Sequence, residues 1–130
     1  MTILVVEDEY LILDFICAEM EDAGTPAVGA TSAEEAMRIL QSREDITGLV
    51  TDINMPGSMD GLALAALVAE RWPDVGIVIT SGRRAPLAHE MPADSQFVPK
   101  PFIPRQIIDA MERITRRKGI RQSMTVHSNL

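Results

Sequence analysis

Short, β-branched apolar runs recur along this chain, and a polar residue follows each of them. Runs of this kind are typical of buried parallel strands, because helices cover both faces of a parallel sheet. Ligands of open α/β sheets bind at the carboxyl ends of the strands, which is where these polar residues would gather. The clearest runs are Ile3–Val6, followed by Glu7 and Asp8; Ile46–Thr51, followed by Asp52; Ile77–Ile79, followed by Thr80; and Phe97–Val98, shortly before Lys100.

Segments with the period of a helix alternate with these runs. Capping and breaking residues support the assignment, because Ser32 and Glu35 form a capping box and Pro73 ends a helical pattern. The alternation predicts one α/β domain, a doubly wound (βα)5 fold with a five-stranded parallel sheet. Strands are expected over residues 2–7, 26–30, 47–52, 75–80 and 96–99, and helices over residues 10–23, 33–43, 62–72 and 103–118.

Two helices carry most of the expected packing against the sheet. The last helix has an apolar stripe of Ile107, Ile108, Met111 and Ile114. In the first helix, acidic residues are expected to face outward. The face expected to pack consists of Leu11, Ile12, Phe15, Ile16 and Ala18.

The connection between the fourth and fifth strands breaks the pattern. Pro86 and Pro92 each remove a backbone donor and restrict the residue before them, and Gly82 adds backbone freedom. We therefore expect a shortened or broken fourth helix, with one or two turns at most around residues 87–91. Beyond the last helix, a polar and flexible tail is expected over residues 119–130.

The net charge of −7 is unevenly distributed along the 130 residues. Residues 1–60 carry 13 acidic and 2 basic residues, whereas residues 61–130 carry 6 acidic and 10 basic residues. An acidic half argues against nucleic acid as the main ligand. We interpret the basic residues near the end of the last helix as a solvated helix terminus rather than a nucleic-acid-binding tail. No direct binding of nucleic acid is expected.

The chain has one cysteine, Cys17, and two isolated histidines. A disulfide framework is excluded, and no pattern of zinc ligands is present. No apolar run reaches the ~18 residues that a membrane span needs, and no signal-peptide pattern opens the chain. We therefore expect a cytoplasmic protein that is not inserted into a membrane.

Glu7, Asp8 and Asp52 would crowd one edge of the predicted sheet. Two like charges about 4 Å apart repel by about 4 kcal/mol at an effective dielectric constant of about 20. A hard cation between them offsets this repulsion, and Mg²⁺ in particular takes one or two carboxylates together with phosphate oxygens. The sequence therefore predicts a magnesium site at this edge.

Two roles are open to Asp52: metal ligand alone, or metal ligand and nucleophile. A carboxylate can accept a phosphoryl group and form an aspartyl phosphate. The Lys100 ammonium and Mg²⁺ would supply positive charge to the transferring group. The Thr80 hydroxyl would donate a hydrogen bond to one of its oxygens.

Together, these segments resemble the receiver domain of two-component response regulators over residues 1–118, with the polar tail after it. In this order and spacing the motifs are highly specific. They are Val5–Glu9, Thr51–Pro56 followed by Asp60–Gly61, Ile79–Ser81 and Val98–Phe102.

The resemblance implies a flavodoxin-like, chemotaxis-regulator-like fold. It implies that a sensor histidine kinase or a histidine phosphotransfer protein phosphorylates Asp52. It implies that Asp8 and Asp52 bind Mg²⁺ directly. Glu7 would reach the same ion through water, and Asn54 would bind it through its backbone carbonyl.

The resemblance also implies a switch. Thr80 and Phe97 would be its coupled pair, and Lys100 would be the phosphate-binding ammonium, with a cis bond to Pro101. The protein would not be an enzyme beyond Mg²⁺-dependent self-phosphorylation and dephosphorylation. Because nothing after residue 118 suggests an output domain, we expect a single-domain regulator that contacts an unknown downstream protein, as a monomer or a weak phosphorylation-dependent dimer.

Two departures from the family pattern are visible. The loop over Gly57–Met59 looks one residue longer than usual, which would reshape the chain beside the metal site without moving Asp52. The broken fourth helix would change a surface that often carries the signal.

Two other functions are compatible with a strand-end aspartate. A phosphatase of the haloacid-dehalogenase type also uses a strand-end aspartate with Mg²⁺, but it needs a second carboxylate where this chain has Asn54, which cannot transfer a proton. A catalytically dead, receiver-like scaffold would lack one of Asp8, Asp52 and Lys100, and all three are present.

Overall fold

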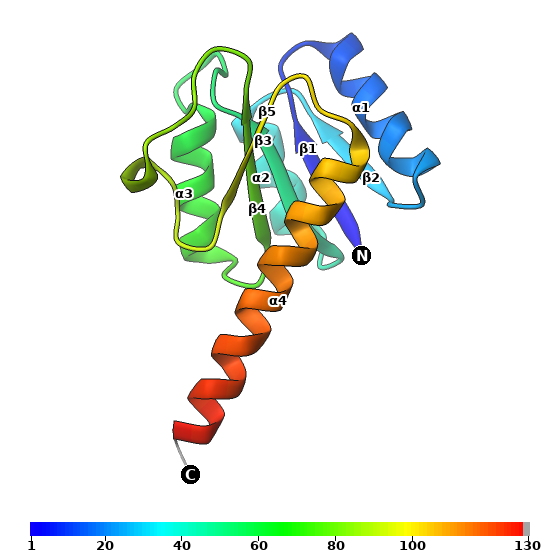
Figure 1. Ribbon diagram of the computed structural model, residues 1–130. Coiled ribbons are helices and arrows are strands. Elements are labelled where there is room, and N and C mark those ends of the chain that lie inside the picture. The colour runs from blue at the N-terminus through cyan, green and yellow to red at the C-terminus, as the bar shows by residue number, and fades with distance from the viewer. Residues whose placement is uncertain (129–130) are drawn as a thin grey trace.

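The computed structural model describes the backbone of residues 1–128 and the side chains of residues 1–118. Its centre is one parallel sheet with helices on both faces (Figure 1). The strands are β1 Thr2–Val6, β2 Ala27–Ala30, β3 Ile46–Asp52, β4 Gly76–Ser81 and β5 Gln96–Pro99. Their order is β2-β1-β3-β4-β5, so the chain winds outward in both directions from β1, as the doubly wound prediction requires.

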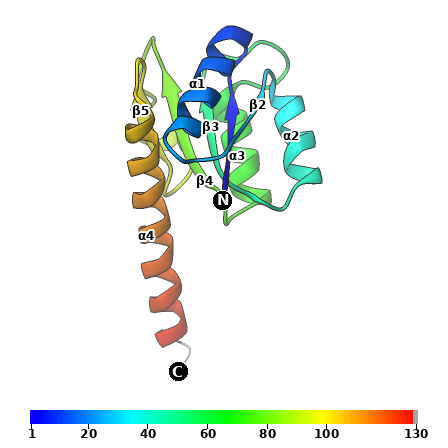
Figure 2. The same cartoon turned by 90° about the vertical axis from the view of Figure 1, so that its right-hand side faces the viewer.

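Four helices cover the sheet, and their bounds are α1 Tyr10–Asp22, α2 Ala33–Ser42, α3 Gly61–Arg71 and α4 Pro104–Ser128. A view along the sheet shows α1 and α4 on one face, with α2 and α3 on the other (Figure 2). The core consequently has two layers. Alternate residues of each strand enter opposite layers, as when Leu4 packs with the α2 and α3 side and Ile3 packs with the α1 and α4 side.

Side-chain caps fix where two of these helices begin. The Ser32 hydroxyl accepts the Glu35 backbone N–H at 3.1 Å, so the expected N-cap of α2 is confirmed. The Asp60 carboxylate accepts the Ala63 backbone N–H at 2.8 Å and caps α3. Each cap satisfies a backbone donor that a helix leaves free in its first turn. The cap at Asp60 also fixes the end of the loop that begins at the carboxyl end of β3.

The face of α1 that packs against the sheet differs from the expected one. Leu13 and Met20 are buried, whereas Leu11 and Phe15 are 83% and 65% exposed. Ile12 and Ala18 are exposed as well, and of the five expected residues only Ile16 packs against the core, so the sequence-based assignment of this face was wrong for the other four. The helix carries apolar residues on nearly all sides, and for such a helix hydrophobicity alone does not select the packed face.

The last helix begins where expected and runs beyond the predicted end. α4 spans Pro104–Ser128, so an end at Lys118 was wrong. A single glycine such as Gly119 disfavours a helix by only about 1 kcal/mol and does not by itself end it. The division into a domain over residues 1–118 and a flexible tail stays a prediction, because the side chains of residues 119–130 lie outside those described.

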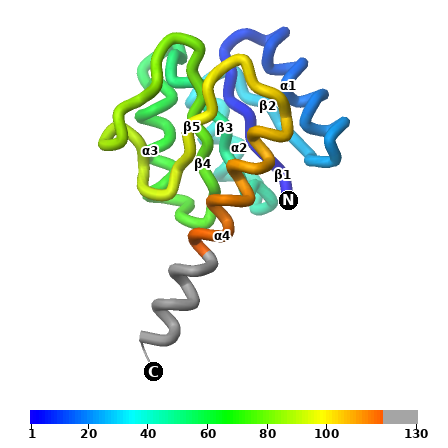
Figure 3. Tube along the Cα trace, viewed as in Figure 1, coloured from blue at the N-terminus to red at the C-terminus, as the bar shows by residue number. Residues whose placement is uncertain are grey.

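No regular helix joins β4 to β5, which confirms the broken fourth helix (Figure 3). The connection contains one short 3-10 helix, η1 Ala88–Glu90. Arg84 pairs with Glu90 through two hydrogen bonds of 2.9 and 3.2 Å, and Glu90 also accepts the Leu87 backbone N–H at 2.8 Å. Arg84, and then the Leu87 N–H, lower the pKa of Glu90 to about 2. Because the folded pKa is lowered, this link is present at neutral pH and is lost only as the pH falls through about 2.

Among residues 1–128, no helix is both long enough and apolar enough to cross a membrane.

Candidate functional site

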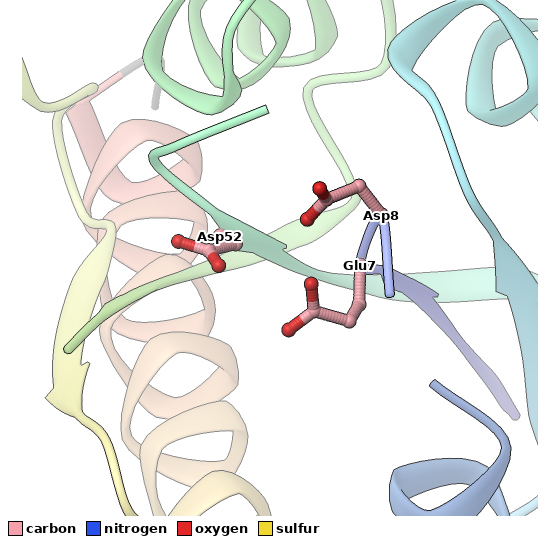
Figure 4. Close-up of side chains that lie close together, drawn as sticks. All are labelled: Glu7, Asp8 and Asp52. Atoms are coloured by element: carbon pink, nitrogen blue, oxygen red, sulfur yellow. The ribbon is translucent and has the colours of Figure 1, made fainter. Parts of the chain in front are cut away.

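Three carboxylates meet at the carboxyl edge of the sheet. Glu7 and Asp8 follow β1, and Asp52 ends β3, the neighbouring strand, in a register that places Val6 beside Thr51. Figure 4 shows the three side chains gathered at these two strand ends. One oxygen from each lies within 4.8 Å of the others. Sheet topology alone therefore brings residues 44 or more positions apart in sequence to one point.

Lys100 joins two of these carboxylates from the end of β5. Its ammonium lies 2.6 Å from Glu7 Oε1 and 2.8 Å from Asp52 Oδ2. Partial burial by itself lowers the pKa of Lys100, but the hydrogen bonds to Asp52 and then to Glu7 outweigh it and raise the pKa above its usual value. Lys100 is therefore a cation at neutral pH and lies against the proposed phosphoacceptor. The Lys100–Pro101 peptide bond is cis, as expected.

Asp52 is held by contacts on both of its oxygens. Oδ2 accepts from Lys100, and Oδ1 accepts the Asn54 backbone N–H at 3.1 Å. Its own backbone carbonyl lies against Gly61, where a Cβ atom would overlap that carbonyl oxygen. Asp52 is nearly buried, whereas Asp8 is exposed. The site thus combines a fixed inner carboxylate with an outer one that is open to solvent.

Of the two predicted switch residues, Thr80 lies beside this cluster and Phe97 lies on the next strand, in different surroundings. Thr80 pairs with Asp52 across β3 and β4, and its buried hydroxyl donates to the Thr51 carbonyl at 3.5 Å, at the outer limit for such a bond. Phe97 pairs with Ile79 and is half-buried against the layer under α2 and α3. The structure therefore places Thr80 next to Asp52, and Phe97 on a strand adjacent to Thr80.

The donor set suits a hard divalent cation. Oxygen ligands from carboxylates, together with a backbone carbonyl and water, match the preferences of Mg²⁺. Asp8 and Asp52 supply carboxylates from two strand ends, and Asn54 lies beside them in the loop after β3. Lys100 alone is a single positive charge near three negative ones, so the cluster retains net negative charge for a cation to neutralise.

Binding of Mg²⁺ is expected to stabilise the fold. At about ten times its Kd, a ligand of the native state adds about 1.4 kcal/mol, or roughly 4 °C in Tm for a domain of this size. Asp8→Asn should reduce the increase, whereas Glu9→Gln, a change to an exposed neighbour that lies outside the cluster, should not. Thermal unfolding with and without millimolar Mg²⁺ measures this. An unchanged Tm of the original protein would show that the cation site is wrongly placed.

Two contacts near the site were not anticipated from the sequence. The Ser81 hydroxyl, at the end of β4, accepts the backbone N–H groups of Arg83 and Arg84 at 3.2 and 3.4 Å. The Ser58 hydroxyl donates to Glu34 Oε1 on α2 at 3.0 Å. The only signal for the second contact was the longer loop that contains Ser58, and nothing in that loop names its partner.

Comparison with known proteins agrees with this geometry. Residues 3–112 match the sequence model of the family described as "Response regulator receiver domain". A response regulator receiver protein from an Anaeromyxobacter species is 34% identical over 116 residues, which cover 88% of this chain and 45% of that protein. A putative NtrX-like response regulator from Rickettsia conorii is 33% identical over 62% of this chain and 17% of its own length. The chain thus spans less than half the length of these curated relatives.

Solved structures give the same result. A response regulator receiver protein from Sinorhizobium medicae superposes with a TM-score of 0.79 at 33% identity, over 88% of this chain and 94% of that one. A receiver domain protein from Clostridium thermocellum has the same TM-score at 27% identity, over 92% and 97% of the two chains.

Proposed function

This chain belongs to the response regulator receiver domain family, and on that premise we propose that Asp52 accepts a phosphoryl group from a histidine kinase or a histidine phosphotransfer protein. The observation that carries the proposal is the Asp52 side chain itself. It is nearly buried beside a lysine ammonium and two further carboxylates at the carboxyl edge of the sheet. This is an arrangement for binding a cation and a phosphoryl group together.

In the proposed transfer, a carboxylate oxygen of Asp52 attacks phosphorus. A P–O bond forms and the P–N bond of the phosphohistidine breaks, with its electron pair returning to the imidazole nitrogen. Mg²⁺, held by Asp8, Asp52 and the Asn54 carbonyl, with Glu7 acting through water, would neutralise charge on the phosphoryl oxygens when bound. The protein then carries an aspartyl phosphate on Asp52.

Lys100 and Thr80 act on the product. The Lys100 ammonium already touches Asp52 Oδ2 and needs only a small displacement to pair with a phosphoryl oxygen. The Thr80 hydroxyl makes one long hydrogen bond to Thr51 and would exchange it for a shorter one to the phosphoryl group. Phe97, on the neighbouring strand, would then change its packing, so that the chemical change at Asp52 reaches the surface.

We propose that the phosphodonor docks on the exposed face of α1. Five of the seven large apolar residues that are exposed in the described structure lie in α1 or just before α4: Tyr10, Leu11, Ile12, Phe15 and Ile103. Phe15 and Phe102 line one small hollow, so the two segments form a continuous surface. α1 begins two residues after Asp8, which places this surface beside the phosphoacceptor. Exposed apolar patches of this kind mark protein-interaction sites.

Changes on this face are expected to slow transfer from a protein donor while leaving the chemistry intact. Leu11→Ser and Phe15→Ser should each reduce the transfer rate from a phosphorylated histidine phosphotransfer protein by about tenfold or more, as loss of an interface anchor does. Labelling by a small phosphodonor should be unchanged. Leu87→Ser, a change to another exposed apolar residue that lies outside the α1 face, is the matched control. Equal losses with both donors would contradict docking at α1.

We also propose that phosphorylation is communicated to the connection between β4 and β5. This connection begins after Ser81, the neighbour of Thr80, and the Ser81 hydroxyl accepts the backbone N–H groups of Arg83 and Arg84 within it. It has only three residues of 3-10 helix and few buried side chains, as is usual for segments that open at low energetic cost. A change at Thr80 would therefore change its order and offer or remove a surface for a downstream protein.

Amide hydrogen exchange measures this second step. We expect residues 83–94 to exchange faster than β3 and α3 in the resting protein, and more slowly with Mg²⁺ and beryllofluoride, a mimic of the phosphoryl group. Thr80→Ala should remove this difference without preventing phosphorylation. Exchange that changes only around Asp52, or a segment that is already as protected as β3 at rest, would contradict this route.

A further inference from the structure

The loop between β3 and α3 has two well-fixed ends and an exposed middle. At its start, the Ile53 backbone N–H donates to the Thr80 carbonyl at 3.0 Å, and Met55 is buried. At its end, Asp60 caps α3. The intervening residues 56–58 are exposed.

A hydrogen bond from Ser58 to Glu34 joins this exposed middle to α2. The donor–acceptor distance is 3.0 Å, and the two residues are 24 positions apart. Gly57 permits the approach, because its φ of 102° lies in a region that residues with a side chain rarely adopt. A Cβ at Gly57 would lie 3.9 Å from the Glu34 carboxylate, an ordinary contact, so backbone conformation rather than crowding requires glycine here.

Glu34 is well suited to act as a fixed acceptor. It lies in the first turn of α2, where the helix dipole favours a negative charge. Hydrogen bonding with its own backbone N–H, and then with Ser58, lowers the pKa of Glu34 below its usual value. The side chain is therefore ionised at neutral pH, and charged acceptors make the stronger hydrogen bonds.

We propose that Glu34 is a positioning residue, which acts through Ser58 to fix the loop that presents the Asn54 carbonyl to the cation. The Asn54 N–H donates to the Asp52 carboxylate on one side. On its other side the chain leads to residues 56–58, which the hydrogen bond from Ser58 joins to α2. Loss of the hydrogen bond between Ser58 and Glu34 lets the chain after Asn54 adopt more conformations. The cation site is then less well formed before the cation binds. An effect of Glu34 on phosphorylation rests on the proposed function. An effect of Glu34 on the conformation of the loop does not depend on that function.

The first measurement uses the metal-free protein and no phosphodonor. Glu34→Ala and Ser58→Ala should increase amide exchange at Asn54 and Gly61, whose N–H groups donate to Asp52 and to the Ile53 carbonyl, by about 2- to 10-fold, the effect of losing one hydrogen bond. The double variant should behave like either single variant, because both remove the same contact. Both residues are exposed, so the Tm of the domain should remain nearly unchanged.

The second measurement is the Kd for Mg²⁺ by calorimetry, with variants that separate contact from charge. Glu34→Ala and Ser58→Ala should weaken binding by about 2- to 10-fold. Glu34→Gln keeps an acceptor oxygen for Ser58 but loses the charge that strengthens the hydrogen bond, so it should lose less Mg²⁺ affinity than Glu34→Ala. Glu44→Ala removes an exposed carboxylate that lies after α2, outside the contact, and should also have little effect.

Three results would overturn the positioning role. One is unchanged exchange and Mg²⁺ affinity in Glu34→Ala and Ser58→Ala. The second is an equal loss of affinity in Glu34→Gln and Glu34→Ala, which would assign the effect to long-range charge. The third is a loss of affinity in Glu34→Ala that Ser58→Ala does not share. Failure of the original protein to be phosphorylated on Asp52 would instead count against the proposed function, and the exchange and Mg²⁺ measurements would still decide the role of Glu34.

Discussion

Asp52→Asn is expected to reduce phosphorylation to background with both a small phosphodonor and a protein donor. The amide keeps the size of the side chain and one acceptor oxygen, so it can retain the contact with Lys100 or the one with the Asn54 N–H but not both, and the site should remain folded. It lacks the anionic oxygen that would attack phosphorus. Incorporation of radiolabelled phosphate into purified protein, with Mg²⁺ present, measures the loss.

Two further variants separate the nucleophile from its surroundings. Asp8→Asn should still be labelled, but slowly, because it weakens the cation site without removing the nucleophile. Asp60→Asn changes an exposed carboxylate in the same loop and retains a good helix cap, so it should be labelled at the original rate. Labelling of Asp52→Asn at the original rate would show that another residue accepts the phosphoryl group.

Among glycine-to-alanine substitutions near the site, Gly61→Ala is expected to cause the largest loss of stability. Alanine is favoured over glycine in a helix by about 1 kcal/mol. The new Cβ, however, would overlap the backbone carbonyl oxygen of Asp52, and neither of these two backbone segments can yield without moving a strand end or a helix start. Overpacking of this kind costs about 3 kcal/mol, or roughly 10 °C in Tm for a domain of this size.

The same substitution should also damage the site, because relief of the overlap displaces Asp52. A lower Tm should therefore accompany a weaker Mg²⁺ affinity. Gly82→Ala is the matched control: its nearest heavy atom would be Lys100 Cβ at 3.8 Å, an ordinary contact, so its Tm should change by no more than a few degrees. A Gly61→Ala variant as stable as the original protein would contradict the close approach of Asp52 and Gly61.

The fold followed from the sequence because its signals are local and repeated. Each strand is a short apolar run, and parallel strands bring their carboxyl ends to one edge of the sheet. This rule sufficed to predict that Glu7, Asp8, Asp52 and Lys100 would meet, although they lie on three different strands or strand ends. Pro86 and Pro92 similarly predicted the shortened or broken helix between β4 and β5, because proline acts on its own backbone and on its neighbour.

Features that depend on tertiary packing could not be predicted in this way. The sequence of α1 is apolar on nearly every side, so the exposed position of Leu11 and Phe15 emerges only when the helix is placed against the sheet. The link between Ser58 and Glu34 depends on how closely the β3–α3 loop approaches α2. Neither residue has a property in the sequence that distinguishes it from other surface residues.

The most direct measurement is to locate the phosphoryl group on the protein. Treatment of the phosphorylated protein with borohydride converts an aspartyl phosphate into homoserine, which mass spectrometry detects at a defined position. Trypsin should release residues 44–71 as one peptide, which contains Glu44, Asp45, Asp52, Asp60 and Glu70. We predict homoserine at position 52, formed only when the phosphodonor and Mg²⁺ were both present. Modification at another carboxylate, or an unmodified peptide from protein that has incorporated phosphate, would contradict the assignment of Asp52 as the phosphoacceptor.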